Sequence, residues 1–287
     1  MNNIPSEKNL VSIGLPVYNG LPYLKKAIES ILTQTYPNLE LIITDNPSTD
    51  RTEAICEEYA HKDSRVKYIR HKTNIGACEN YNSALQIARG EYFNWVSFDD
   101  FLAPQYIEKC VAVLKDDKEA VMVMSDYVHT NYKGEVTHKL DPKKFIITER
   151  NLYLRLKKFI LLRWWDGKAM NIHGLWRREA IVNDVYRDLP DGDINFSFRG
   201  LSRGPFLFVP EVLFYKGVLP GGESREHEKL TIKRLVLAIG TRIKLIQTHF
   251  INAKFIIKIK KLSAWKRVKL CWWEIYFTAS MFTRRKF

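Results

Sequence analysis

The chain has 287 residues, of which 46% are hydrophobic and 13% aromatic, so it can bury a sizeable core and is not a disordered protein. Its formal net charge is +13, and the whole excess lies in residues 231–287, which hold 14 Lys and Arg against one acidic residue, Glu274. Residues 1–230 are therefore balanced in charge, which argues against a body that binds nucleic acid.

Two further features bear on the compartment. The first ten residues are polar and lack the apolar stretch of a secretory signal. The four cysteines are scattered and none has the spacing of a zinc ligand; they are Cys56, Cys78, Cys110 and Cys271. This pattern predicts a reducing cytoplasm and no zinc site.

Strand-like and helix-like segments alternate along the first half of the chain. A strand at 10–17 precedes a helix at 21–32, in which apolar residues recur at helical spacing. The alternation continues with strands at 39–44, 66–70, 92–98 and 120–128 and with helices at 50–60, 79–89 and 104–114. This rhythm predicts an α/β fold, in which helices cover both faces of a mostly parallel sheet.

Polar residues follow three of these strands. They are Pro16 to Asn19 after the first strand, Asp45 to Asp50 after the second, and the pair Asp99 and Asp100 after the fourth. Ligands of parallel sheets bind outside the carboxyl ends of the strands, so we expect these residues at one rim. The chain lacks both glycine-rich phosphate loops, G-x-G-x-x-G and G-x-x-x-x-G-K-[ST]. A carboxylate pair can still hold a diphosphate through Mg²⁺, so the rim predicts a metal and diphosphate site.

Six segments, taken in order, resemble family 2 glycosyltransferases of the GT-A fold. They are VSIGLPVYNG, LELIITDNPSTDRT, NIGACENYNSAL, ARGEYFNWVSFDDFLAP, NIHGLWRREAI and DGDINFSFRGLSRGPFLFVPEVLFY. The resemblance covers residues 9–225 and rests on their order and spacing. It implies a GT-A catalytic domain, which we place at residues 1–230, with a Rossmann-like, mostly parallel central sheet.

The resemblance also implies roles for particular residues. Asp45 would contact the nucleotide base, with Pro16, Tyr18 and Asn19 in the loop that lies against it. Asp99 and Asp100 would hold Mn²⁺ or Mg²⁺ and, through it, the donor diphosphate, with Asp99 also on the nucleotide. Asp193, six residues before Arg199, would be the catalytic base.

The chain departs from the family pattern at several of these positions. The family often has a further Asp at position 97, which is Ser97 here, Asp-Gly at positions 46 and 47, which are Asn46 and Pro47, and Glu at position 192, which is Gly192. A His that often follows the last strand is also missing from the stretch VLPGGESRE. These departures bear on the metal and on the choice of donor more than on the fold.

The implied reaction moves a sugar from a nucleotide-sugar donor, by family preference a UDP-sugar, to a hydroxyl of a glycan or lipid-linked glycan. Attack opposite the diphosphate would invert the anomeric centre. The stretch LLRWW has no Gln three residues before Arg163, so it does not match the Q-x-x-R-W motif of processive synthases. These features favour a non-processive enzyme of cell-surface polysaccharide synthesis, such as lipopolysaccharide or capsule. The alternative is a non-catalytic nucleotide-fold protein that binds nucleic acid or anionic lipid through its basic tail.

Each assignment has a simpler structural alternative. Asp99 and Asp100 could form a solvated turn that caps the next helix, and Asp45 could only cap a turn. Asp193 could cap a helix that begins near Ile194, which would leave Asp191 as the base. An aromatic group could line the sugar pocket or belong to the core; it comprises Trp164, Trp165, His173 and Trp176.

The basic tail, residues 231–287, has no uncharged stretch long enough to span a bilayer. On a helix, Phe255, Ile259 and Leu262 form an apolar stripe beside lysines, and aromatic residues follow. This pattern predicts a helix that lies on an anionic leaflet, which makes the protein cytoplasmic and peripheral on the inner face of the cell membrane. The alternative is a tail that packs on the catalytic body or on a second subunit.

Overall fold

The computed structural model describes residues 5–131, 133–139, 146–162, 168–186, 192–218 and 251–283. The strands are β1 Glu7–Val17, β2 Leu39–Asp45, β3 Val66–Arg70, β4 Gly90–Trp95, β5 Phe101–Leu102, β6 Met122–Thr130, β7 Val136–Lys139, β8 Leu175–Arg177 and β9 Phe206–Gly217. The helices are α1 Leu24–Leu32, α2 Thr52–Lys62, α3 Ala77–Ile87, α4 Tyr106–Asp116, α5 Leu152–Leu161, α6 Gly192–Leu201 and α8 Ala264–Thr283, with short 3₁₀ turns η3 Lys168–His173 and η4 Arg178–Ala180.

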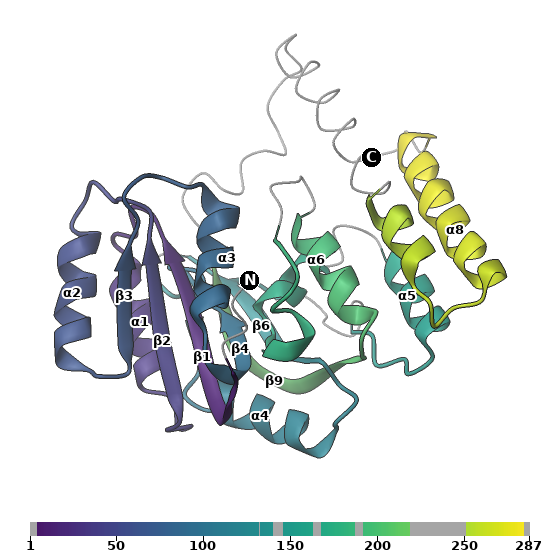
Figure 1. Cartoon of the computed structure of the whole chain (residues 1–287). Coiled ribbons are helices and arrows are strands. Elements are labelled where there is room, and N and C mark those ends of the chain that lie inside the picture. The colour runs from purple at the N-terminus through teal and green to yellow at the C-terminus, as the bar shows by residue number, and fades with distance from the viewer. Residues whose placement is uncertain are drawn as a thin grey trace, which may run out of the picture.

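The strands form a single twisted sheet within the described residues. Its order is β3-β2-β1-β4-β8-β6-β9-β5, and β7 pairs with β6 outside this path. The pairs β1–β2, β1–β4, β2–β3 and β6–β9 are parallel, whereas β8 is antiparallel to both neighbours. Figure 1 shows α3 in front of the strands and α1 behind them. The α/β fold predicted from the sequence, with a mostly parallel sheet between helices, is therefore confirmed.

The first strand and helix show how the sequence builds this architecture. Strand β1 is buried along most of its length, and helix α1 turns Leu24, Ala27, Ile28 and Ile31 toward the core, which is the i, i+3, i+4, i+7 spacing of an amphipathic helix. Gly14 lets α3 approach closely, because a Cβ there would lie 2.9 Å from the Cβ of Ala84. The carboxyl end of β1 is thereby fixed between β2 and β4.

The sheet differs from the sequence prediction in several places, and two of them lie next to the rim. Strand β4 ends at Trp95, and Ser97 to Asp100 form a turn closed by the hydrogen bond from the Asp100 N–H to the Ser97 carbonyl, 3.0 Å. The short strand β8 was not foreseen, and it separates β4 from β6. Three residues are too few for a visible alternation of apolar and polar side chains, which explains the omission.

The described part of the tail packs against the body of the protein. Residues 251–258 are helical, and α8 runs beside α5 (Figure 1). The ring of Phe255 lies 6.2 Å from that of Phe198 in α6, and Asn195 donates a hydrogen bond to Asn252. Leu262 is buried. The prediction that Phe255, Ile259 and Leu262 face a membrane is wrong, because these side chains pack on the core.

A different face of the tail is open. Its exposed apolar side chains are Ile257, Trp265, Val268 and Trp272. No helix in the described part of the chain is long and apolar enough to cross a membrane. The predicted boundary at residue 230 lies outside the described residues and stays a prediction.

Candidate functional site

The carboxyl ends of β1 and β2 lie side by side, as the sequence predicted. Val17 pairs with Asp45 in the parallel register, and the Asn46 N–H donates to the Val17 carbonyl, 3.0 Å. Asn80 of α3 donates from its side chain to the carbonyls of Thr44, 2.9 Å, and Val17, 3.3 Å. The first two of the three polar segments therefore meet at one rim.

The loop after β1 is held by the segment after β2. Asn19 has a φ of 52°, in the left-handed region that Asn tolerates. Its N–H donates to Ser48 Oγ, 2.9 Å, and its side-chain oxygen accepts from the Thr49 N–H, 2.8 Å. Pro16 is buried within β1, whereas the ring of Tyr18 is 44% exposed. This leaves an aromatic ring available at the rim for a flat ligand.

Asp45 is more enclosed than a base-binding residue needs to be. Its side chain is 0% exposed, and its two oxygens accept from Ser48 Oγ, 2.5 Å, and from the hydroxyl of Tyr68, 2.8 Å. The Arg70 guanidinium lies 3.6 Å away. The carboxylate is thus held by two hydroxyl groups, and a base reaches it only if Ser48 or Tyr68 moves. The role of Asp45 in binding a base stays a prediction.

The carboxylate pair lies on the same rim but is held by β9. Asp100 is 0% exposed, and it accepts from Lys216 Nζ at 2.8 and 3.1 Å and from the Gly217 N–H at 3.0 Å. Asp99 is 12% exposed, and its nearest oxygen lies 4.0 Å from Lys216 Nζ. Helix α4 begins at Tyr106 without a side-chain cap, so the pair does not cap this helix.

A glycine makes this close contact possible. A Cβ on Gly217 would lie 2.0 Å from the carbonyl oxygen of Asp99, which is far inside van der Waals contact. The end of β9 therefore packs backbone to backbone against the turn that carries the pair. The neighbouring Lys216 is aimed at the carboxylates by this arrangement.

Burial and neighbouring charges shift the pKa values of the cluster. Burial raises the pKa of Asp99; the Lys216 charge lowers it and the Asp100 charge raises it further. Burial alone would lower the pKa of Lys216, but the charges of Asp100 and Asp99 and the hydrogen bond to Asp100 outweigh it, and the pKa is raised. Burial and the Lys216 charge lower the pKa of His173 to about 3, so this imidazole is neutral at pH 7.

His173 of η3 lies beside Asp100, and its role in a sugar pocket stays a prediction. Its Nδ1 lies 4.0 Å from an Asp100 oxygen and 3.3 Å from the Trp95 carbonyl. Trp176 does not line a pocket: its side chain is 0% exposed, and it packs edge-on against Phe196 and Phe206. The prediction that Trp176 stacks on a sugar is wrong, because strand β8 turns its ring into the core.

Asp193 lies in the first turn of α6 and is half buried, and its side chain accepts from the Ile194 N–H, 2.8 Å. Helix α6 packs against η3, which carries His173 to the carboxylates. The helix begins one residue before Asp193, close to where the capping alternative put it. Asp191 and Trp165 lie outside the described residues, so the choice between the two candidate bases stays a prediction.

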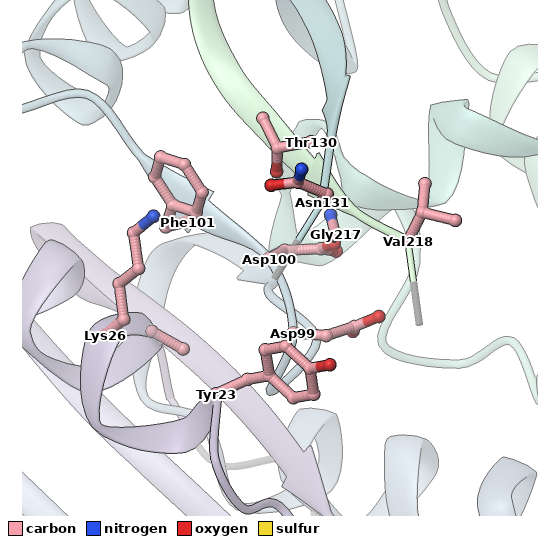
Figure 2. A pocket seen from close by; sticks show the side chains of 10 residues that line it. Tyr23, Lys26, Asp99, Asp100, Phe101, Thr130, Asn131, Gly217 and Val218 are labelled. Carbon is pink, nitrogen blue, oxygen red and sulfur yellow. Dashed lines mark hydrogen bonds between the residues drawn. The ribbon is translucent and has the colours of Figure 1, made fainter. Parts of the chain in front are cut away.

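A small pocket opens beside the pair, and we call it the carboxylate pocket. Figure 2 shows Asp99 beside the ring of Tyr23, with Lys26 reaching toward Phe101. The Lys26 nitrogen lies 3.6 Å from the centre of the Phe101 ring. The residues that line the pocket include Tyr23, Lys26, Asp99, Phe101, Asn131 and Val218.

The residues around the pair can accommodate a divalent cation in part. Carboxylate oxygens are the ligands that Mg²⁺ takes in proteins, usually one or two together with substrate phosphates. Asp99 lines the pocket and fits this role. Asp100 fits it only after release from Lys216. Among the residues that the structure describes, no group of three His, Cys, Asp or Glu side chains could hold a metal, so phosphate oxygens would have to complete the shell.

Sequence reasoning missed Lys216, Tyr68 and Tyr81. Tyr81 shares a hydrogen bond of 2.9 Å with Ser97, the position where the family often has a third Asp. Lys216 reaches the rim because β9 runs parallel to β6 and its carboxyl end lies at the same edge of the sheet. The sequence LFYKG shows a single charge at the end of an apolar run, which is the available signal.

Comparisons with known proteins agree with this geometry. A family model described as Glycosyl transferase family 2 matches residues 12–177. An uncharacterized glycosyltransferase of Rickettsia typhi is 38% identical over 231 residues, which are 77% of this chain and 65% of that protein. Glycosyltransferase GlyA of Streptococcus pneumoniae serotype 4 is 27% identical over 82% of this chain and 34% of its own length. The chain thus spans less than two thirds of both relatives.

Solved structures share the fold. TarS 1-349 of S. aureus, crystallised in complex with UDP-GlcNAc, has a TM-score of 0.68 and 17% sequence identity, covering 94% of this chain and 72% of that one. The mannosyltransferase PcManGT from Pyrobaculum calidifontis, in complex with GDP-Man and Mn²⁺, has a TM-score of 0.52 and 15% identity, covering 96% and 76%. The GT-A fold is thereby confirmed. Since the family model matches more than half of the residues, from within β1 to the end of β8 and with the carboxylate pair, the chain belongs to glycosyl transferase family 2.

Proposed function

We propose that this protein transfers a sugar from a UDP-sugar to a hydroxyl group of a glycan or lipid-linked glycan, with inversion of the anomeric centre and one sugar per encounter. The observation that carries the proposal is the arrangement of the rim: an exposed aromatic ring at Tyr18, and a carboxylate pair with its own lysine, in a member of this family. The setting would be cell-surface polysaccharide synthesis, of lipopolysaccharide or capsule.

The rim offers separate places for the parts of the donor. The base would stack on Tyr18 in the loop with Pro16 and Asn19, and the diphosphate would lie toward Asp99 and Lys216. A bound Mn²⁺ or Mg²⁺, held by Asp99, would supply Lewis-acid stabilisation of the leaving diphosphate. The TarS and PcManGT structures of the same fold hold UDP-GlcNAc and GDP-Man, which supports a nucleotide-sugar donor for this protein.

The transfer step needs a base on the acceptor side. Asp193 would accept the proton of the acceptor hydroxyl as its oxygen attacks the anomeric carbon, while the bond to the diphosphate breaks and the nucleoside diphosphate leaves. A carboxylate within reach of the acceptor hydroxyl can act as such a general base. Asp191 is the alternative base.

The described tail supports a second partner, the surface of an anionic membrane. Its exposed side chains Trp265, Val268 and Trp272 are spaced i, i+3 and i+7, so they form one stripe on α8. Lys269 lies over Trp265, 5.1 Å from the ring centre. Indole rings beside lysines are typical of helices at the headgroup level, where each basic residue adds about 1 kcal/mol.

A screen of nucleotide sugars tests the catalytic proposal. The protein is incubated with UDP-, GDP- and other nucleotide sugars, with Mn²⁺, Mg²⁺ or EDTA, and released nucleotide is measured. Release from UDP-sugars above that of an Asp193→Asn control is the expected result. No release from any donor, together with no binding of UDP by calorimetry, would favour the non-catalytic alternative.

Membrane binding is tested by sedimentation with vesicles of anionic and of neutral lipid. The variant Trp265→Ala/Trp272→Ala changes only exposed side chains, so it should keep the thermal stability of the wild type and lose binding to anionic vesicles. Equal sedimentation of the two proteins would remove this stripe as the membrane contact.

A further inference from the structure

The ammonium group of Lys216 already occupies the position that a cation would need. Its nitrogen lies 2.8 and 3.1 Å from the two oxygens of Asp100 and 4.0 Å from Asp99. Asp100 is buried, and the Gly217 N–H also donates to it, 3.0 Å. Both oxygens of Asp100 are therefore used by β9.

The backbone holds this lysine in place. The end of β9 pairs with β5, where the rings of Phe101 and Tyr215 are stacked with centroids 4.6 Å apart. The next N–H along, that of Val218, donates to the Thr130 carbonyl at the end of β6, 2.9 Å. The lysine thus starts from a fixed strand end on the carboxylates. The pairing of β9 with β5 and β6 therefore fixes the backbone of Lys216 next to Asp100.

The charges around Asp99 and Asp100 decide whether a cation can bind to these carboxylates. The ammonium of Lys216 lies within 4.0 Å of both carboxylates in a mostly buried cluster. A divalent cation on Asp100 would stand next to the ammonium in a region of weak screening, where like charges repel strongly. The cation and Lys216 therefore compete for Asp100.

We propose that Lys216 is a built-in competitor of the divalent cation, and that it couples metal binding to the arrival of the donor diphosphate. The proposal rests on the diphosphate role given to this rim above. Without nucleotide, Lys216 holds Asp100 and the cation binds weakly. When a diphosphate lies in the rim, its oxygens offer Lys216 a new partner, and Asp100 becomes free for the metal.

The coupling between the cation and the diphosphate is reciprocal. If the diphosphate raises metal affinity by some factor, the metal raises diphosphate affinity by the same factor. Lys216 is a positioning residue in this scheme, because it acts on the metal through Asp100. The consequence is a site that stays closed to Mn²⁺ until a donor is present.

The test measures Mn²⁺ affinity directly, from the electron paramagnetic resonance signal of free Mn²⁺, with and without UDP. Lys216→Met should bind Mn²⁺ at least tenfold more tightly than the wild type without UDP, and UDP should improve its Mn²⁺ affinity by a smaller factor than in the wild type. Lys26→Met is the matched control: Lys26 lines the same pocket, but its nitrogen lies over the Phe101 ring and not on the pair. Its Mn²⁺ affinity should stay within twofold of the wild type.

Lys216→Gln carries the same test if the Met variant does not fold, since it removes the charge and keeps a hydrogen-bond donor for Asp100. Mn²⁺ affinity that is unchanged or weaker in the Lys216 variants overturns the proposal, as does an equal gain in Lys26→Met. Absence of Mn²⁺ binding in every protein overturns it as well. In that case UDP binding in EDTA, measured by calorimetry, shows whether the proposed donor site still stands.

Discussion

Replacing Asp100 by Asn should destabilise the fold, although the residue lies at the site and not in the hydrophobic core. The change keeps the size of the side chain and an acceptor for the Gly217 N–H, but it removes the charge opposite Lys216. The ammonium is then left in a mostly buried position without its counter-ion. Asp99→Asn is the matched control, because it changes the neighbouring carboxylate in the same way.

The magnitude follows from the burial of the two partners. Removing one member of a buried ion pair costs about 3–5 kcal/mol of stability. Asp100 is 0% exposed, whereas the Lys216 side chain is 23% exposed and can recover part of its hydration, so we expect a loss of about 2–4 kcal/mol. Asp99→Asn should cost far less or stabilise, because the raised pKa of Asp99 shows that its charge is unfavourable in the fold.

The assay is urea unfolding followed by tryptophan fluorescence, supported by thermal melts. At roughly 2–4 °C per kcal/mol for a protein near this size, Asp100→Asn should lower the melting temperature by about 4–16 °C. The double variant Asp100→Asn/Lys216→Met should recover most of the loss, since both charges are gone. Equal small losses for the two Asn variants, or no recovery in the double variant, would refute the ion-pair reasoning.

Three further outcomes are expected. Asp193→Asn should lower sugar transfer by about 10²-fold or more and leave UDP affinity unchanged in calorimetry, because the base acts on the acceptor proton; if Asp191→Asn has this effect instead, the roles are exchanged. Tyr68→Phe should reduce the free energy of unfolding by about 1–3 kcal/mol in urea titrations, since Asp45 loses a buried donor, and an unchanged value would mean that water replaces the hydroxyl. Trp176→Ala should reduce the free energy of unfolding by about 3–5 kcal/mol in the same assay, because the ring is buried in the core. A loss of donor affinity without a loss of stability would instead mean that this ring belongs to the binding site.

The arrangement of the rim could be predicted because it depends on the spacing of apolar residues and on the order of strands and helices along the chain. Apolar runs that end in Val17, Asp45 and Trp95 alternate with amphipathic helices, and right-handed crossovers bring the ends of such strands to one edge. The sequence therefore predicts that Asp45, Asp99 and Asp100 lie at this rim.

The partners of these carboxylates could not be predicted in the same way. Lys216 follows Asp100 by 116 positions, and the pairing of β9 with β5 and β6 brings the two together. The enclosure of Asp45 depends on Tyr68, which belongs to β3 and whose hydroxyl reaches across the strand end. Contacts between distant strands leave no periodic signal in a single sequence.

The tail illustrates a different limit. A stripe of apolar residues indicates that one face of a helix is covered, but it does not indicate what covers that face. Phe255 and Leu262 pack against the body of the protein, whereas the side chains of Trp265 and Trp272 are exposed. Only the position of α5 and α6 decides between a lipid surface and the protein's own core as the cover.

The contact at Gly217 also bears on how this protein tolerates change. Position 217 is only partly buried, and such positions usually accept many substitutions at little cost in stability. Here the obstacle is a backbone carbonyl, that of Asp99, which cannot rotate aside as a side chain would. Even alanine would push apart two segments more than a hundred residues distant in sequence. In a saturation library, position 217 should therefore behave like a core position, and ranking sites by solvent exposure would misjudge it.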